Sequence, residues 1–287
     1  IAGLARLVGG SYRQSLFAGL LWLTLPQVVL QSTTSQNDLA VTVFALACVY
    51  FLRLGLAEGR PGSLVYSGAA FGLALGSKTT FVFLLPGLAL AVVVWFFSRG
   101  VKQWRLWRNW AVACLAGTVL FGGYIYAQNI ITYRHPFGQY ETGSLEAALA
   151  GGRMETALHN AALYTYQMFD GSGLPSALDE PFMQLKRRVF GRLFRELGMS
   201  GDFAKMSVQQ ILALPTRIHE DLSWFGPLGF LVFLPVVFIQ LVNGIRRRDY
   251  DRLALLALGA GFFAALCYLM GWTLFKGRYF VLGVGLS

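Results

Sequence analysis

The polar stretch QSTTSQND at residues 31–38 leads directly into LAVTVFALACVYFL at residues 39–52, which carries no charge. A helix needs about 20 mostly apolar residues to cross a membrane. Apolar runs of this kind predict helices at 11–32, 38–56, 63–77, 79–97, 110–129, 224–244 and 252–272, with a further one beginning near Tyr279. The sequence therefore predicts an all-α, polytopic bundle of transmembrane helices.

The composition excludes most other classes of protein. Of 287 residues, 55% are hydrophobic and 13% are charged, and the mean hydropathy is +0.54, whereas soluble domains have about 25% charged residues. The three cysteines lie in apolar runs without a CxxC spacing, which is typical of small buried hydrophobes. Because the chain begins with Ile1 and ends within an apolar run, we expect an internal fragment, truncated at both ends.

The basic residues predict the orientation in the membrane. Alternating helices place twelve Lys and Arg residues in the connections of one side and three in the short connections of the other. Short loops rich in Lys and Arg stay in the cytoplasm, so the first side is predicted to be cytoplasmic. We expect an integral protein of the bacterial inner membrane, with its site facing the periplasm or the outside. The net charge of +10 then reflects orientation, and no nucleic-acid partner is expected.

Three regions are expected along the chain. Residues 1–129 form about five membrane helices, 130–223 form an extracytoplasmic insert, and 224–287 form two complete helices and a truncated one. Within the insert we expect short helices at 143–168, 181–198 and 203–214. The segment 186–195 is amphipathic and basic, so it either lies on a lipid surface or packs on the rest of the insert.

Polar residues cluster at the predicted outer ends of the helices. Asp38 opens a helix, where it either caps the helix or serves as a functional carboxylate. Lys78 lies between two apolar runs, and it either extends to the interface or binds a phosphate. Since both belong to the same membrane level, and a lone carboxylate there is expensive, we expect Asp38 within a few ångströms of Lys78.

A second group of candidates lies later in the chain. Lys276, Arg278 and Tyr279 form either an interfacial aromatic belt or an anion clamp, since Arg grips phosphate through two parallel hydrogen bonds. Glu220 and Asp221 precede a predicted helix, as caps or as substrate ligands. No soluble-enzyme motif and no zinc-ligand cluster occurs in the sequence, and no metal ligand is predicted.

The order of these motifs resembles the C-type integral-membrane glycosyltransferases, in particular protein O-mannosyltransferases and lipid A aminoarabinose transferases. The resemblance rests on the following segments: Pro26…Gln31-Ser32-Thr33…Asn37-Asp38, Gly72…Gly76-Ser77-Lys78, Asn129…His135-Pro136-Phe137-Gly138 and Arg278-Tyr279. It spans most of the membrane helices and not the insert 140–218.

The resemblance implies transfer of a sugar from a polyprenyl-phosphate donor to a lipid, glycan or protein acceptor on the extracytoplasmic face. Lys78, Lys276 and Arg278 are then expected at the donor phosphate, with Asp38 in support. Asn37, His135, Glu220, Asp221 and Tyr279 are candidate substrate ligands. The resemblance also implies a catalytic acid in a first outer loop upstream of this chain, and it leaves a divalent cation as cofactor open. The alternative is a transporter or flippase for an anionic or lipid-linked substrate.

Overall fold

The structure is a computed structural model that describes residues 1–99, 103–138, 153–199, 202–203, 205–214, 219 and 222–286. Its elements are α1 (Ala2–Leu7), α2 (Tyr12–Thr24), α3 (Pro26–Ser32), α4 (Asp38–Glu58), α5 (Pro61–Ser77), η1 (Thr79–Leu84), α6 (Leu85–Arg99), α7 (Trp104–Gly117), η3 (Thr118–Gly122), α8 (Gly123–Tyr133), α10 (Arg153–Met168), α11 (Ser176–Glu196), β1 (Asp202–Phe203), β2 (Met206–Ser207), α12 (Val208–Leu212), α13 (Gly226–Leu228), η4 (Gly229–Phe233), α14 (Leu234–Arg247), α15 (Tyr250–Leu269), η5 (Leu274–Tyr279) and α16 (Phe280–Leu286).

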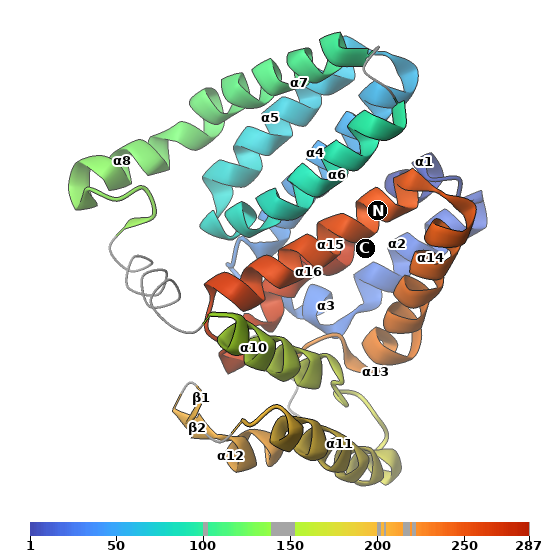
Figure 1. Ribbon diagram of the computed structural model, residues 1–287, viewed down its shortest axis with the longest axis vertical. Coiled ribbons are helices and arrows are strands. Elements are labelled where there is room, and N and C mark those ends of the chain that lie inside the picture. The colour runs from blue at the N-terminus through green and yellow to red at the C-terminus, as the bar shows by residue number, and fades with distance from the viewer. Residues whose placement is uncertain are drawn as a thin grey trace.

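The predicted all-α membrane architecture is confirmed. Five helical segments of the described chain are long and apolar enough to cross a membrane: Asp38–Glu58, Thr79–Ser98, Trp104–Tyr133, Gly226–Arg247 and Tyr250–Leu269. A sixth arises if the bent pair α2 and α3 counts as one span. Helices α4 to α7 lie together in the upper part of the molecule, and α10 to α12 lie beyond the other end of the bundle (Figure 1).

Proline interrupts two of the expected spans. The single helix expected at 11–32 is wrong, because α2 and α3 meet at an angle of 66°. Leu25 has an extended backbone, as the residue before a proline prefers, and Pro26 cannot donate the hydrogen bond that would continue α2. In the span Gly226–Arg247, the π-helical turn η4 ends two residues before Pro235, whose missing N–H disrupts the helical ladder in the same way.

Small residues bring α5 and α7 into close contact. Gly68 and Gly72 face Ala113 and Gly117, and a Cβ added at Gly72 would meet the backbone of Gly117. Small residues spaced four apart allow helices in membranes to pack backbone against backbone. The close packing of α5 and α7 therefore depends on glycine at these positions, because glycine has no side chain to hold the backbones apart. The short distance lets dispersion contacts form along both helices.

An ion pair defines the opposite end of the bundle. Nη2 of Arg53, a buried residue near the end of α4, lies 2.5 Å from Oδ2 of Asp251 in the first turn of α15. Arg53 belongs to the helix that the sequence predicted at 38–56. Since α4 runs from Asp38 toward Arg53, we call the two ends of the bundle the Asp38 end and the Arg53 end.

The insert differs from the expectation at both of its ends. Helix α10 begins at Arg153, and residues 139–152, which include the expected start at 143, lie outside the described residues. The helix expected at 203–214 is wrong: Asp202–Phe203 and Met206–Ser207 pair as two antiparallel strands, and α12 covers only Val208–Leu212. Helix α11 buries Met183, Phe190 and Phe194, so its apolar face packs within the insert, as one of the two alternatives predicted.

Candidate functional site

A carboxylate and two cations meet at the Asp38 end. Nζ of Lys78 lies 2.6 Å from Oδ1 of Asp38, and Nε of Arg278 lies 3.9 Å from Oδ2. The side chain of Asp38 is 2% exposed, whereas those of Lys78 and Arg278 are 18% and 23% exposed. The carboxylate therefore lies beneath the two cations, and the expected proximity of Asp38 and Lys78 is confirmed.

The backbone of three segments positions these side chains. Asp38 is the first residue of α4, and the N-cap position belongs to Asn37, so Asp38 is an acidic residue of the first turn and not the cap. Lys78 follows α5 in an extended conformation, φ −161° and ψ 136°, which separates α5 from η1. Arg278 belongs to η5, the short helix between α15 and α16. Helix termini far apart in sequence thus converge at this point.

Neighbouring polar and aromatic groups complete the cluster. Nη1 of Arg278 donates to Oε1 of Gln36 at 2.5 Å, and the Tyr279 ring centroid lies 5.0 Å from Nζ of Lys78 and 5.4 Å from Cζ of Arg278. Nδ2 of Asn37 donates to the backbone oxygen of Ser77 at 2.5 Å. Asn37 therefore ties the start of α4 to the end of α5, and the ring of Tyr279 faces both cations.

The remaining candidates lie apart from this cluster or outside the described residues. Nζ of Lys276 donates to the backbone oxygen of Gly271, and burial lowers the pKa of Lys276 to about 8. His135 follows α8, which projects away from the bundle (Figure 1), and its Nδ1 accepts a hydrogen bond from the N–H of Phe137. Glu220 and Asp221 lie outside the described residues.

Helix α10 of the insert holds the loop that carries Arg278. Nδ2 of Asn160 donates to the backbone oxygens of Cys267 and Met270, and its Oδ1 accepts from the N–H of Trp272. Gln167 accepts from the indole N–H of Trp272 and donates to the backbone oxygen of Leu274. These bonds satisfy backbone groups at the end of α15 that would otherwise be left without partners.

Asp170 provides a second attachment just beyond α10. Its buried carboxylate accepts from the backbone N–H groups of Ser172, Trp224 and Gly226 at 2.9, 2.9 and 3.2 Å. Trp224 in turn packs directly beneath η5, since a Cβ added at Gly277 would lie 2.8 Å from its Nε1. The carboxylate of Asp170 thereby supports the helix that presents Arg278.

Sequence reasoning missed Asn160, Gln167 and Asp170. All three lie in the insert, where no motif singles them out. A spacing of seven residues between Asn160 and Gln167 places two amides on one face of a helix, and that was the available signal. These amides bind mainly to backbone groups of a loop far away in the sequence, and no sequence pattern predicts such contacts.

The cluster carries a net positive charge that favours an anion. One carboxylate and two cations leave a charge of +1 in a partly buried place, where charges interact more strongly than in water. Among the described residues, no group of three or more His, Cys, Asp and Glu side chains is arranged to hold a metal ion. The chemistry that these groups support is therefore the binding of an anionic oxygen, with Asp38 fixing the two cations.

Comparison with known proteins finds a match for the first part of the chain. Residues 1–121 match the sequence model of the family described as dolichyl-phosphate-mannose-protein mannosyltransferase. No curated protein and no solved structure matches the chain. The matched region contains Asp38 and Lys78, but not Arg278 or the insert.

The apolar helices are those of an integral membrane protein, and residues 1–121, less than half of the chain, are similar to a glycosyltransferase family. The resemblance to C-type integral-membrane glycosyltransferases is thus confirmed over residues 1–121. The similarity is to the mannosyltransferase type within that class.

Proposed function

We propose that the protein transfers a sugar from a polyprenyl-phosphate donor to a lipid, glycan or protein acceptor, and that Lys78 and Arg278 bind the donor phosphate. The observation that carries the proposal is the convergence of these two cations on the buried carboxylate of Asp38. Fixed cations aimed at a departing phosphate stabilise the charge that develops in the transition state.

The reaction requires the protein to accept a proton from the acceptor hydroxyl and to stabilise the departing phosphate. The hydroxyl oxygen of the acceptor forms a bond to the anomeric carbon, while the bond from that carbon to the phosphate oxygen breaks and its electron pair leaves with the phosphate. The hydroxyl proton passes to a general base, which must lie close to the reacting atoms. Asp38 is buried and paired with Lys78, so we assign it to holding the cations and not to proton abstraction.

The orientation is part of the proposal. We place the Asp38 end and the insert outside the cytoplasm, because the Arg53 end carries most of the Lys and Arg residues of the short connections. Single cysteines at Arg105 and Arg246 should react only with permeant reagents in intact cells, and one at the exposed Leu185 should also react with impermeant reagents. Labelling of Leu185→Cys from the cytoplasm alone would overturn this placement.

Arg278→Ala tests the donor site. In the full-length protein reconstituted in lipid, transfer from a polyprenyl-phosphate sugar should fall by roughly 10²–10³, the effect of removing a fixed charge-stabilising donor. Arg278→Lys should recover part of the rate, because Lys keeps the charge but not the two-point geometry. Arg246→Ala at the Arg53 end is the matched control and should retain the rate. Near-wild-type transfer by the Ala variant would leave Arg278 as an interfacial anchor.

A further inference from the structure

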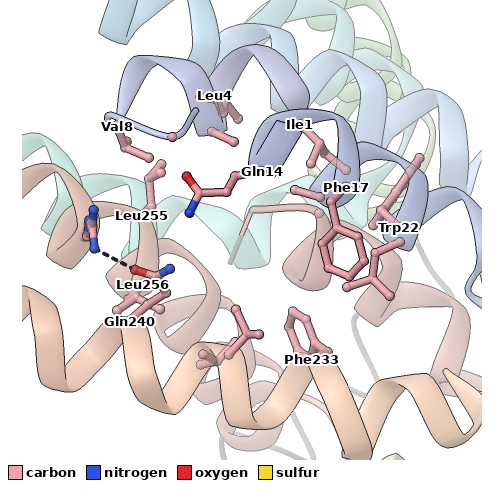
Figure 2. A pocket seen from close by; sticks show the side chains of 18 of the residues that line it. Ile1, Leu4, Val8, Gln14, Phe17, Trp22, Phe233, Gln240, Leu255 and Leu256 are labelled. Atoms are coloured by element: carbon pink, nitrogen blue, oxygen red, sulfur yellow. Dashed lines mark hydrogen bonds between the residues drawn. The ribbon is translucent and has the colours of Figure 1, made fainter. Parts of the chain in front are cut away.

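A cavity of about 530 Å³ lies between helices from the two ends of the chain. It is enclosed by α1 and α2 on one side and by α14 and α15 on the other (Figure 2). This volume is within the range of about 300–1,000 Å³ that is common for small-molecule sites. The cavity reaches Val284 and Gly285 of α16 but includes neither Asp38 nor Arg278.

The two halves of the cavity differ in polarity. Figure 2 shows Phe17, Trp22 and Phe233 grouped at one end, and the amides of Gln14 and Gln240 facing the space at the other. Asn243, Arg247 and Arg252 line the polar half as well. Val8, Leu255 and Leu256 lie at this end too, so the lining is apolar along its length and its polar side chains gather at one end.

The polar half lies at the Arg53 end. Arg247 is the last residue of α14, and Arg252 lies in the first turn of α15, next to the Asp251 that pairs with Arg53. Arg53 lies fifteen residues along α4 from Asp38, or about 22 Å at the rise of an α-helix. The polar half is thus remote from the proposed donor site.

The arginine side chains in the polar half of the cavity are not fully neutralised by acidic partners. Nε of Arg252 lies 2.8 Å from Oδ2 of Asp249, and its Nη1 donates to Gln240 at 3.0 Å. Arg247 is exposed, and neither it nor Asn243 makes a side-chain hydrogen bond or ion pair within the described part of the chain. The charge of Arg247 and the amide of Asn243 are therefore available to a ligand next to the apolar part of the cavity.

We propose that this cavity binds one anionic glycerophospholipid, with its phosphate at Arg247 and Asn243 and an acyl chain in the apolar half. The charge of Arg247 complements a phosphodiester, and basic residues next to a membrane attract anionic lipids of the cytoplasmic leaflet. A purely hydrocarbon occupant would leave the amide of Asn243 against apolar atoms, which is costly. The inference rests on the orientation proposed above, but it does not depend on the proposed sugar transfer.

Native mass spectrometry of the full-length protein tests the proposal. The protein is released from nanodiscs containing equal amounts of dioleoyl phosphatidylglycerol and dioleoyl phosphatidylcholine, and the retained lipid is counted. Wild type should keep one phosphatidylglycerol in preference to phosphatidylcholine. Arg247→Gln should reduce its retention about fivefold, the contribution of one basic residue near a lipid surface, while Arg246→Gln, one residue away and outside the lining, should not.

A second pair of variants tests the apolar half. Val237→Trp should fill this part of the cavity and abolish retention, whereas Ile239→Trp on the exposed face of the same helix should leave it intact, with melting temperatures measured for both. Equal retention of the two lipids, no effect of Arg247→Gln, or no effect of Val237→Trp would each overturn the proposal. So would the mass of a second protein chain in place of a lipid.

Discussion

Nζ of Lys78 lies 2.6 Å from Oδ1 of Asp38, although forty residues separate them in the chain. They meet because α4 and α5 are consecutive antiparallel helices, so the start of the first and the end of the second reach the same level. A buried carboxylate is expensive unless a cation and hydrogen bonds compensate it. Arg278, which approaches the second oxygen of Asp38, adds to that compensation from a third segment.

Breaking this pair should destabilise the protein more than removing it entirely. We expect Lys78→Met to lower the free energy of unfolding by about 3–5 kcal/mol, since it leaves the buried carboxylate without its closest cation. The double variant Asp38→Asn, Lys78→Met should be more stable than the single one, because neither charge remains. Denaturant titration in detergent measures both, and a double variant no more stable than Lys78→Met would contradict a buried ion pair.

The attachment of the insert to η5 can be tested at Asp170. Asp170→Asn weakens acceptance from the N–H groups of Trp224 and Gly226, and each hydrogen bond to a charged group contributes about 1.5–3 kcal/mol. We expect the free energy of unfolding to fall by about that amount and the transfer rate to fall as well, because Trp224 underlies Gly277.

A control for Asp170 is available on α10. Glu155→Gln also removes a carboxylate, but from an exposed position in the first turn of the helix, so its effect on stability should stay within about 0.5 kcal/mol. If the two variants lose equal stability, Asp170 does not have the anchoring role that its hydrogen bonds indicate.

Gly72 offers a test of the contact between α5 and α7. We expect Gly72→Ala to lower the free energy of unfolding by about 1–3 kcal/mol, because the added methyl group overpacks the contact with Gly117. Gly62→Ala lies in the same helix and meets no atom within 4 Å, so the better helix propensity of Ala should leave stability unchanged or raise it. Unfolding measurements on the two variants separate packing from propensity, and equal values would argue against a close helix contact.

Lys186 should make the stability of the insert depend on pH. Burial lowers its pKa from 10.5 to about 8, while Asp170 raises it and Arg187 lowers it. The unfolded chain then binds more protons than the folded one between about pH 8 and pH 10.5, so stability rises with pH across this window. Below pH 8 the cost of burying the charge is fully present, reduced by the contact of Nζ with the Tyr166 ring at 3.9 Å.

The matched variant for this effect is Lys186→Met, which keeps the length of the side chain and cannot titrate. The difference in unfolding free energy between wild type and Lys186→Met should change in favour of wild type from pH 7.5 to pH 9.5. A difference independent of pH would mean that the lysine is equally protonated in both states.

The sequence by itself determined the membrane class, most of the helical spans and the pairing of Asp38 with Lys78. These follow from local properties: the length of the apolar runs, the position of charges at their ends, and the alternation of consecutive helices across a membrane. Motifs at 26–38 and 72–78 also sufficed for the family resemblance, which the match over residues 1–121 confirms.

Only the tertiary structure decided which of the later cations reaches Asp38. Lys276 and Arg278 are two residues apart and look equivalent in sequence, yet the turn of η5 directs Arg278 to Asp38 and Lys276 to the backbone oxygen of Gly271. The attachment of α10 through Asn160, Gln167 and Asp170 was equally hidden, because their partners are backbone groups and every residue has the same backbone. Long-range contacts of this kind depend on how the helices pack, and packing is a property of the whole chain.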